Sequence, residues 1–492
     1  MGSYGGERRK VKDICVVGAG PAGIGASKYL LAENCFDTID VFEQQASFGG
    51  VWNYSNDPID TIDIPQTNPH QPLDEPIWRP CSNLNGVSNG AQKAIFVSPM
   101  YERLETNIPH SIMKFSDMPS LEDHQLFPSR EVVTQYLEDY GEDVKHLVSF
   151  QTQVMDISQT RPGAHQVRLK DLRTNTVYGK IYDAVVVANG HYTVPILPKI
   201  KGIEKWNQTS PGVISHTKFY RRPKPFADKK VIIVGNAASG TDIASQIGAV
   251  CKRPLLMSQR SVSILASAAG YKENVPEIAE FLPVSHGTRA VRFADGRVEE
   301  DVDAILFATG YYYSFPFLSS SLESKLISTG ERVQHLYKHL FYIDDPTIAF
   351  IGLPAKIIPF RTAEGQAAVV ARVWADRLDL PSTSEMSRWE EDVVAEHGVG
   401  RSFHVLSFPK DIDYHNELVD WATRATGRGG KMSMRWSAKE RWARERFPAI
   451  KKAFADEGDA RHDIKTLQEL GFDYDAWLRE QLLQNGVEAG HS

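Results

Sequence analysis

Cysteine is scarce in this chain of 492 residues, which contains only four. They lie at Cys15, Cys35, Cys81 and Cys251, and no two of them form a C-x-x-C pair or have the spacing of a metal site. The sequence therefore predicts neither a disulfide framework nor a dithiol redox centre. We expect all four thiols to be reduced and structural, and we expect no bound metal.

Long apolar runs are also missing. No stretch reaches the roughly 18 apolar residues that a membrane-spanning helix needs. The first ten residues lack the apolar segment of a secretory signal. We therefore expect a soluble, cytoplasmic protein that has no membrane partner.

An excess of positive charge is lacking as well. The chain has 55 basic and 62 acidic residues, which gives a formal net charge of −7. Such a balance argues against a nucleic-acid partner. The basic stretches at 439–446 and 451–452 are interpreted as the solvated side of an amphipathic helix.

What the sequence does contain is a glycine-rich turn between an apolar strand and a helix. Residues 14–17 are apolar, residues 18–23 read GAGPAG, and small and apolar residues then recur at helical spacing to Leu31. In such a unit Gly18 permits the turn, Gly20 lets the backbone approach a pyrophosphate, and Gly23 lets the helix pack on the strand. The pattern predicts a dinucleotide site.

The end of the next strand indicates which dinucleotide is bound. The segment TIDVFE ends in Glu43, 25 positions after Gly18. A carboxylate there can accept hydrogen bonds from a ribose diol and would repel a 2′-phosphate. The first turn therefore favours FAD or NAD over NADP.

A second unit of the same kind follows in the segment VIIVGNAASGTDIASQIG, which begins at Val231. Here Ala237 stands where the middle glycine would be, which weakens pyrophosphate binding without excluding it. The next strand ends in Arg260, again 25 positions after the first glycine, Gly235. A guanidinium suits the 2′-phosphate of NADPH, with Ser258 or Ser261 as hydroxyl donors. The first turn is therefore predicted to hold FAD, and the second NADPH.

Two later apolar strands, in the segments 182–192 and 302–313, close on Ala-x-Gly. The second of them follows the second nucleotide unit, where the chain would return to the first domain. We therefore expect an α/β protein with two Rossmann-like domains, the NADPH domain inserted in the FAD domain. The expected parts are residues 1–205 and 312–492 for the FAD domain, with a C-terminal helical tail, and 206–311 for the NADPH domain.

FAD and NADPH in one chain imply hydride transfer to the flavin, after which the electrons need an acceptor. A disulfide reductase would need a cysteine pair, and an electron transferase would need a docking face or a metal centre. Oxygen needs no redox side chain in the protein. A monooxygenase is therefore favoured, and an NADPH oxidase or electron-transfer flavoprotein that produces H₂O₂ stays open as the alternative.

The chain resembles the flavin-containing monooxygenases, nearest to their short soluble microbial and yeast members. FGGVWNY (48–54) is similar to the family's Gly-Gly-x-Trp segment along the flavin, and YERLETNIPHSIMKFSDMP (101–119) to the segment whose asparagine faces the isoalloxazine, here Asn107. SPGVISHTKFY resembles the family fingerprint with Gly212, His216 and Tyr220 in place and Ser210 instead of phenylalanine. The family's ATGY segment is present at 308–311.

The resemblance implies an enzyme that uses NADPH and O₂ to oxygenate a soft nucleophilic sulfur or nitrogen of a small molecule through a C4a-hydroperoxyflavin. It assigns Asn107 to the hydroperoxide and NADP⁺, and His216 to positioning rather than acid–base catalysis. Baeyer–Villiger oxidation is the runner-up, and Tyr220 argues against it because those enzymes carry tryptophan there. A homodimer is expected by analogy. The expected cofactor-binding residues are Gly18, Gly20, Pro21, Ala22, Gly23, Glu43, Gly50, Val51, Trp52, Asn107, His216, Tyr220, Gly235, Ala238, Ser239, Gly240, Arg260, Ala308, Thr309 and Gly310.

Overall fold

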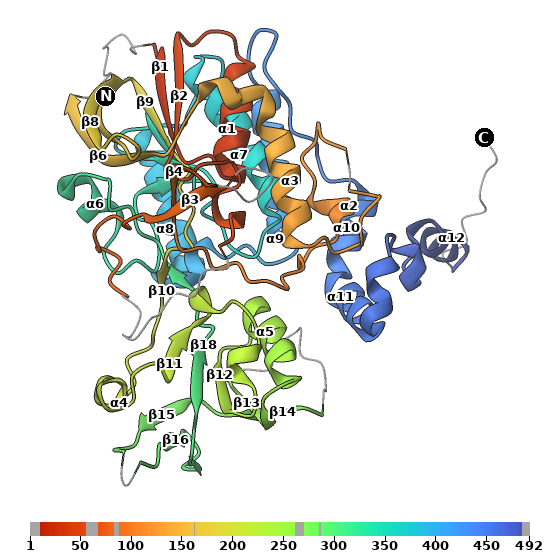
Figure 1. Cartoon of the computed structure of the whole chain (residues 1–492). Helices are drawn as coiled ribbons and strands as arrows, with labels where there is room; N and C mark the ends of the chain where they lie inside the picture. The colour runs from red at the N-terminus through yellow and green to blue at the C-terminus, as the bar shows by residue number, and fades with distance from the viewer. Residues whose placement is uncertain are drawn as a thin grey trace.

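A computed structural model of the chain describes residues 10–55, 67–82, 88–119, 121–161, 163–260, 270–284 and 287–484. Its largest sheet has seven strands in the order β20-β21-β22-β9-β1-β2-β5 (Figure 1). The five strands from β22 to β5 run parallel, whereas β21 is antiparallel to both of its neighbours. The strands are β1 (Asp13–Val17), β2 (Thr38–Glu43), β5 (Val148–Phe150), β9 (Ala184–Val187), β20 (Leu336–Tyr337), β21 (Phe341–Tyr342) and β22 (Ile348–Phe350).

Both faces of this sheet are covered, which is why its central strands are apolar without alternation. Ile14 and Val16 of β1 face a core formed with helices α1 (Pro21–Leu31), α3 (Arg130–Gly141) and α7 (Pro359–Trp374). Cys15 and Val17 face a second core formed with a three-stranded antiparallel sheet. Its strands are β6 (Thr152–Arg161), β7 (Ala164–Asp171) and β8 (Thr176–Tyr182).

A second parallel sheet, drawn below the first in Figure 1, has the order β11-β18-β12-β13-β14. Helix α5 (Ala238–Gly248) covers one face, and α4 (Ile203–Thr209) with a small antiparallel sheet covers the other. The strands are β11 (Ile214–His216), β12 (Lys230–Val234), β13 (Lys252–Ser258), β14 (Lys272–Val275) and β18 (Ala304–Phe307), and the small sheet has β15 (Ile278–Phe281), β16 (Val291–Phe293) and β17 (Val298–Glu299).

The two segments that connect the sheets run side by side. β10 (Val194–Pro195) pairs antiparallel with β19 (Tyr311–Tyr312), and the backbone N–H of Ile196 donates to the carbonyl of Gly310 at 2.8 Å. All strands of the second sheet lie between these segments, while the first sheet takes strands from both sides of them. The α/β class is confirmed. The domain boundaries at residues 205 and 311 stay a prediction.

The remaining described elements lie mainly after residue 319. Within the described residues no helix is long and apolar enough to cross a membrane. The elements are β3 (Ile77–Ser82), β4 (Ser88–Ile95), α2 (His110–Met113), α6 (Ser320–Leu326), α8 (Thr383–His397), α9 (Lys410–Thr423), α10 (Ala438–Glu445), α11 (Phe447–Asp456) and α12 (Tyr474–Gln484), together with short 3₁₀ turns. Helix α6 packs on the side of the three-stranded sheet, whereas α10 and α11 lie on the side of α3, and α12 extends away from the first sheet (Figure 1).

Candidate functional site: two glycine turns and the segments between them

The first glycine turn joins β1 to α1, as predicted. Gly18 has φ +99° and donates its N–H to the Phe42 carbonyl of β2 at 2.8 Å. A Cβ on Gly18 would lie 2.8 Å from the Ala188 carbonyl oxygen, and one on Gly23 would lie 1.8 Å from the Gly18 carbonyl oxygen. Close packing of the turn, the helix and the end of β9 therefore requires both glycines.

Gly20 is not required by the fold in the same way. Its φ of −74° and ψ of −175° are open to any residue, and a Cβ there would meet Gly50 Cα at an ordinary 3.5 Å. No side chain caps the start of α1, where Pro21 and Ala22 are half-buried. The first N–H groups of the helix are thus oriented to bind an anion that approaches Gly20 closely.

Glu43 lies behind this turn at the end of β2 and is 5% exposed. Its Oε2 accepts a hydrogen bond from Ala19 N–H at 2.7 Å, and its Oε1 accepts one from Gln45 N–H at 2.8 Å. Burial raises the pKa of Glu43 above its ordinary value, and backbone N–H groups of Ala19, Gln45 and Gln44 oppose that rise. A carboxylate has about four lone-pair sites, which leaves room for a further donor.

The Gly-Gly-Val-Trp segment lies beside the first turn. Gly49 N–H donates to the Ala19 carbonyl at 3.2 Å, and Gly50, with φ +55°, would place a Cβ 3.0 Å from Gly20 Cα. Gln45 Nε2 donates to the Gly50 carbonyl, and Thr134 of α3 donates to that of Trp52. The structure therefore brings Gly49 and Gly50 to the turn, and Val51 and Trp52 follow directly. Contact of this segment with a flavin stays a prediction.

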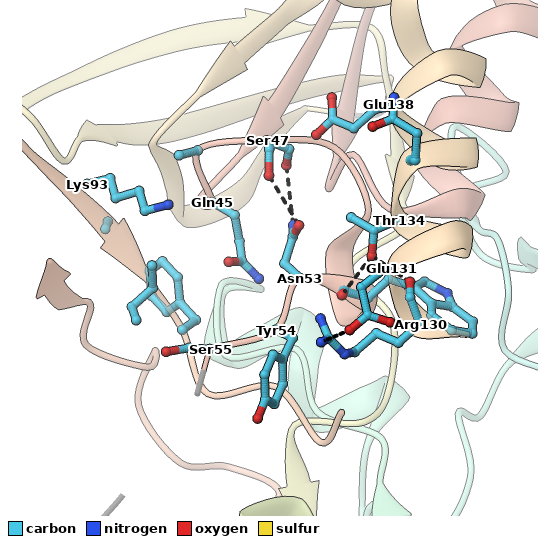
Figure 2. A pocket seen from close by; sticks show the side chains of 16 residues that line it. Gln45, Ser47, Asn53, Tyr54, Ser55, Lys93, Arg130, Glu131, Thr134 and Glu138 are labelled. Atoms are coloured by element: carbon cyan, nitrogen blue, oxygen red, sulfur yellow. Dashed lines mark hydrogen bonds and ion pairs between the residues drawn. The ribbon is translucent and has the colours of Figure 1, made fainter. Parts of the chain in front are cut away.

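A cavity of about 310 Å³ adjoins this segment between β4, α3 and residues 45–55. Figure 2 shows its polar lining, where Ser47 donates to Asn53 and Arg130 forms an ion pair with Glu131. The Arg130 guanidinium also lies 4.0 Å from the centre of the Tyr54 ring. This mixed polar and aromatic lining begins two residues after Glu43 and continues along Trp52.

Asn107 lies in a turn whose backbone is fixed on both sides. Thr106 N–H donates to the Pro128 carbonyl at 2.9 Å, and Thr106 Oγ1 donates to the Ile108 carbonyl at 2.8 Å. Asn107 itself is half-buried, and its side-chain amide forms no hydrogen bond with another described residue. The turn is held in place while both the donor and the acceptor of the amide stay available for a ligand.

The second glycine turn repeats the geometry of the first. Gly235 has φ +106°, and a Cβ on it would lie 2.6 Å from the Ala308 carbonyl oxygen. The matching distance in the first turn, from a Cβ on Gly18 to the Ala188 carbonyl oxygen, is 2.8 Å. A Cβ on Gly240 would lie 2.3 Å from the Gly235 carbonyl oxygen. No side chain caps the start of α5, which begins with Ala238 and Ser239.

The residue behind the second turn that corresponds to Glu43 is not the predicted Arg260, because the two strands are aligned differently with their turns. Gly18 N–H donates to Phe42 of β2, whereas Gly235 N–H donates to Ser258 of β13, 2.9 Å away. The counterpart of Glu43 is therefore Gln259, whose Oε1 accepts from the Asn236 side chain at 2.8 Å. The second turn thus has a neutral amide where the first has a carboxylate.

Arg260 follows Gln259 and points into solvent, with 80% of its side chain exposed. Its Nε forms an ion pair with Glu277. Ser258 is 1% exposed and donates to the Pro276 carbonyl at 3.0 Å, so its hydroxyl does not reach the turn. Ser261, the other expected donor, lies outside the described residues.

The Ala-Thr-Gly segment after β18 connects the second turn with the crossover strands. Ala308 is the residue that packs on Gly235, and Thr309 Oγ1 donates to the Ile196 carbonyl. Arg401 donates from Nη2 to the Thr309 carbonyl at 3.0 Å, and a Cβ on Gly310 would lie 2.7 Å from that nitrogen. Nothing in the sequence pattern indicated Arg401, because it lies about 90 positions further along the chain.

His216 and Tyr220 are buried supports rather than residues at the rim of a turn. His216 is 0% exposed, and its Nδ1 accepts from Lys218 N–H at 3.1 Å. Burial lowers the pKa of His216 to about 3, with the Lys218 charge as a second cause, so the imidazole is neutral. Tyr220 is 3% exposed, and its hydroxyl donates to Gln246 of α5 at 3.1 Å.

Within the part of the chain that the structure describes, a metal ion would need a cluster of His, Cys, Asp or Glu side chains, and a dithiol would need a pair of cysteines. No cluster of three or more His, Cys, Asp or Glu side chains there is arranged to hold a metal ion. Cys15, Cys35 and Cys251 are free thiols, and Cys15 lies within the first sheet. Burial raises the pKa of Cys15, so this thiol is unreactive.

Comparison with known proteins identifies the family of this chain. The sequence model of the flavin-binding monooxygenase-like family matches residues 91–282 and 264–419. The chain is 31% identical over 444 residues to the flavin-containing monooxygenase FMO GS-OX3 of Arabidopsis thaliana, covering 87% of each protein. It is 30% identical to the thiol-specific monooxygenase of Saccharomyces cerevisiae, covering 83% of this chain and 85% of the yeast protein.

Among solved structures, the S-allyl-L-cysteine S-oxygenase of Allium sativum aligns with a TM-score of 0.74 and 26% identity. The alignment covers 96% of this chain and 99% of that protein. Cyclohexanone monooxygenase, at 13% identity, aligns with a TM-score of 0.54 and shares the fold.

Proposed function

Because the chain belongs to the flavin-binding monooxygenase-like family, we propose that it oxygenates a sulfur atom of a small molecule with NADPH and O₂, using FAD bound at the first glycine turn. In this reaction NADPH supplies two electrons, one oxygen atom of O₂ is added to the sulfur lone pair, and the other leaves as water. Bound FAD supplies the chemistry that accepts the hydride and activates O₂. The protein supplies binding, orientation and exclusion of water.

The first turn fits the pyrophosphate of FAD. The uncapped start of α1 and the open approach at Gly20 suit two phosphate groups, and Glu43 offers carboxylate oxygens to the adjoining ribose. Gly50, Val51 and Trp52 would lie along the same ligand. The observation that carries the assignment is that neither its backbone angles nor its neighbours require a glycine at position 20.

The second turn fits NADPH. Gln259 has no negative charge to repel a 2′-phosphate, and Arg260 lies next to it in solvent. Glu277 competes for the guanidinium in the free protein, so phosphate binding would exchange one ion-pair partner for another. The Ala308–Gly310 segment, which packs on this turn and leads into the crossover strands, would then lie beside the dinucleotide.

Asn107 is proposed to contact the reacting end of the flavin. Its amide has a donor and an acceptor without partners among the described residues, on a turn held by Thr106 and Pro128. Such an amide can donate one hydrogen bond and accept another at the flavin until substrate arrives. These hydrogen bonds would limit the loss of reducing equivalents to H₂O₂.

Sulfur is proposed before nitrogen because of two relatives. The yeast relative is named a thiol-specific monooxygenase, and the garlic structure is an S-oxygenase of S-allyl-L-cysteine. A polarisable sulfur lone pair is also the softest nucleophile that a small metabolite offers. The expected homodimer stays a prediction, to be tested by light scattering of the purified protein.

The experiment is a product assay under turnover. Purified protein with FAD and NADPH is incubated with a thiol, an S-alkyl cysteine, a tertiary amine or a cyclic ketone, and NADPH consumption, H₂O₂ and product are measured together. We expect thiol or sulfide to be oxygenated with little H₂O₂. Amine-only or ketone-only oxygenation would reassign the substrate class, and H₂O₂ equal to NADPH with every substrate would overturn the monooxygenase proposal.

A further inference from the structure

Helices α10 and α11 lie against the part of the chain that carries Asn107, whereas α12 extends away from it (Figure 1). The match to the family model ends at residue 419, so the segment 438–484 lies outside it. The amphipathic pattern predicts that the lysines at 451 and 452 are solvated, which is wrong for Lys451. Lys452 is exposed, but Lys451 is half-buried because its side chain turns inward over the Phe127 ring.

An apolar cluster joins the two segments. Leu126 and Phe127 pack with Ile450 and Phe454 of α11, and all four side chains are at most 1% exposed. The Phe127 and Phe454 rings lie 4.7 Å apart. Removing such contacts exposes two buried aromatic rings, so α11 cannot leave this surface without a large loss of hydrophobic burial.

Polar contacts then fix the backbone of the Asn107 segment itself. Lys451 Nζ donates to the Thr106 carbonyl at 2.7 Å, directly before Asn107. Arg461 Nε lies 3.3 Å from both carboxylate oxygens of Glu105. Downstream, the Ile464 carbonyl accepts from Leu126 N–H at 2.7 Å.

These contacts surround Asn107 without touching it. The Leu126 carbonyl in turn accepts from His110 N–H at 3.0 Å, so the residues before Asn107 and the turn after it are both tied to the segment 447–465. Of the contacts from α11, only that of Lys451 reaches the peptide unit that adjoins Asn107. A rotation of that peptide would move the Asn107 side chain directly.

We infer that Lys451 is a positioning residue, which fixes the orientation of the Asn107 amide through the Thr106 carbonyl. The expected effect on turnover rests on the proposed role of Asn107. That Lys451 fixes the peptide between Thr106 and Asn107 rests on the contacts alone. The segment 438–484 then serves as a clamp that limits leakage of reducing equivalents to H₂O₂.

The test compares Lys451→Met, Lys451→Arg and Lys452→Met in the FAD-loaded protein. Methionine keeps the stem over Phe127 and removes the donor, and arginine keeps a donor and the charge. Lys452 is the matched control, because it is the next residue of the same helix and forms a surface ion pair with Asp456 of that helix. Each variant is measured by amide hydrogen exchange of peptides that cover residues 104–110, by the rate of flavin reduction by NADPH, and by H₂O₂ released per NADPH.

We expect Lys451→Met to exchange about fivefold faster in residues 104–110, as loss of one hydrogen bond of about 1 kcal/mol implies. The H₂O₂ released per NADPH should rise severalfold while flavin reduction is unchanged. Lys451→Arg should restore both readouts in part, and Lys452→Met should match wild type. Equal exchange in Lys451→Met and Lys452→Met would overturn the inference. If wild type forms no oxygenated product, the proposed function fails, and the exchange data still decide whether Lys451 fixes the segment.

Discussion

Ala237 of the second turn has the backbone conformation of Gly20 of the first. The φ and ψ angles are −72° and −177° at Ala237 and −74° and −175° at Gly20. Both values lie in the extended region that any residue adopts. The glycine of the first turn is therefore explained by what approaches it, and the alanine of the second turn shows that the fold accepts a methyl group there.

The first prediction concerns Gly20→Ala. We expect a folded protein whose FAD dissociation constant is raised about tenfold, equivalent to about 1.4 kcal/mol, because the methyl group displaces the pyrophosphate. Gly18→Ala is the contrasting variant. At φ +99° and 2.8 Å from the Ala188 carbonyl oxygen it should destabilise the fold by about 2 kcal/mol or more. FAD titration and urea unfolding separate the two effects. Unchanged FAD affinity in a folded Gly20→Ala protein would remove the phosphates from this turn.

The second prediction concerns cofactor choice. Gln259→Glu places a carboxylate at the counterpart of Glu43, and we expect it to raise the KM for NADPH about tenfold with little change for NADH. Arg260→Ala should act in the same direction, since it removes the guanidinium proposed to bind the 2′-phosphate. Lys252→Ala, at the other end of β13, is the control. Equal losses with both nucleotides would contradict a 2′-phosphate role for this strand end.

The third prediction concerns Asn107. Asn107→Asp keeps the size of the side chain and removes its donor, and we expect flavin reduction by NADPH to stay within about twofold of wild type. Oxygenated product should fall, with H₂O₂ replacing it. Parallel loss of reduction and oxygenation would show that the variant disturbs nucleotide binding instead, and normal turnover would remove Asn107 from the site.

The fourth prediction concerns a buried histidine pair. His404 Nδ1 lies 3.1 Å from His339 Nδ1, and Val333 N–H donates to His404 Nε2 at 3.1 Å. The proton of neutral His404 is therefore on Nδ1 and is donated to His339. Burial lowers the pKa of His339 to about 3 and that of His404 well below its ordinary value.

As pH falls below about 6.5, the unfolded chain protonates these rings before the folded protein does, so stability present above that pH is lost toward about pH 3. His404→Asn removes one such titration, so the free energy of unfolding should fall less steeply with decreasing pH, by about 1.4 kcal/mol per pH unit. Glu43, whose pKa is raised by burial, acts in the opposite direction and is common to both proteins. Urea unfolding from about pH 7.5 to about pH 4.5 tests the difference in slope. Parallel curves for wild type and variant would contradict a neutral buried pair.

Features of the fold and the site could be predicted from the sequence where they depend on residues close together in the chain. Gly18, Gly23, Gly235 and Gly240 were predicted because each serves a strand–turn–helix unit of a few residues. The equivalence of Arg260 with Glu43 did not hold. Val17 pairs with Phe42, 25 positions later, but Val234 pairs with Ser258, 24 positions later. Counting 25 positions from Gly235 therefore gives Arg260, one residue beyond the structural counterpart of Glu43.

Features that join distant segments could not be predicted. Arg401 reaches Thr309, and Lys451 reaches Thr106, through contacts that depend on how the helices pack. An amphipathic pattern reports which helix face is apolar, but not that a lysine beside that face turns its amine onto a carbonyl 345 positions away. Figure 1 shows the reason, since α11 lies beside a segment from the first third of the chain.

The most direct test of the account is the fate of isotopically labelled oxygen. The FAD-loaded protein is supplied with NADPH, ¹⁸O₂ and an S-alkyl cysteine, and the product, the labelled water and H₂O₂ are measured against NADPH consumed. We predict one ¹⁸O atom in each sulfoxide and one sulfoxide per NADPH, with H₂O₂ a minor product. Substrate that stays unlabelled, together with one H₂O₂ per NADPH, would contradict it.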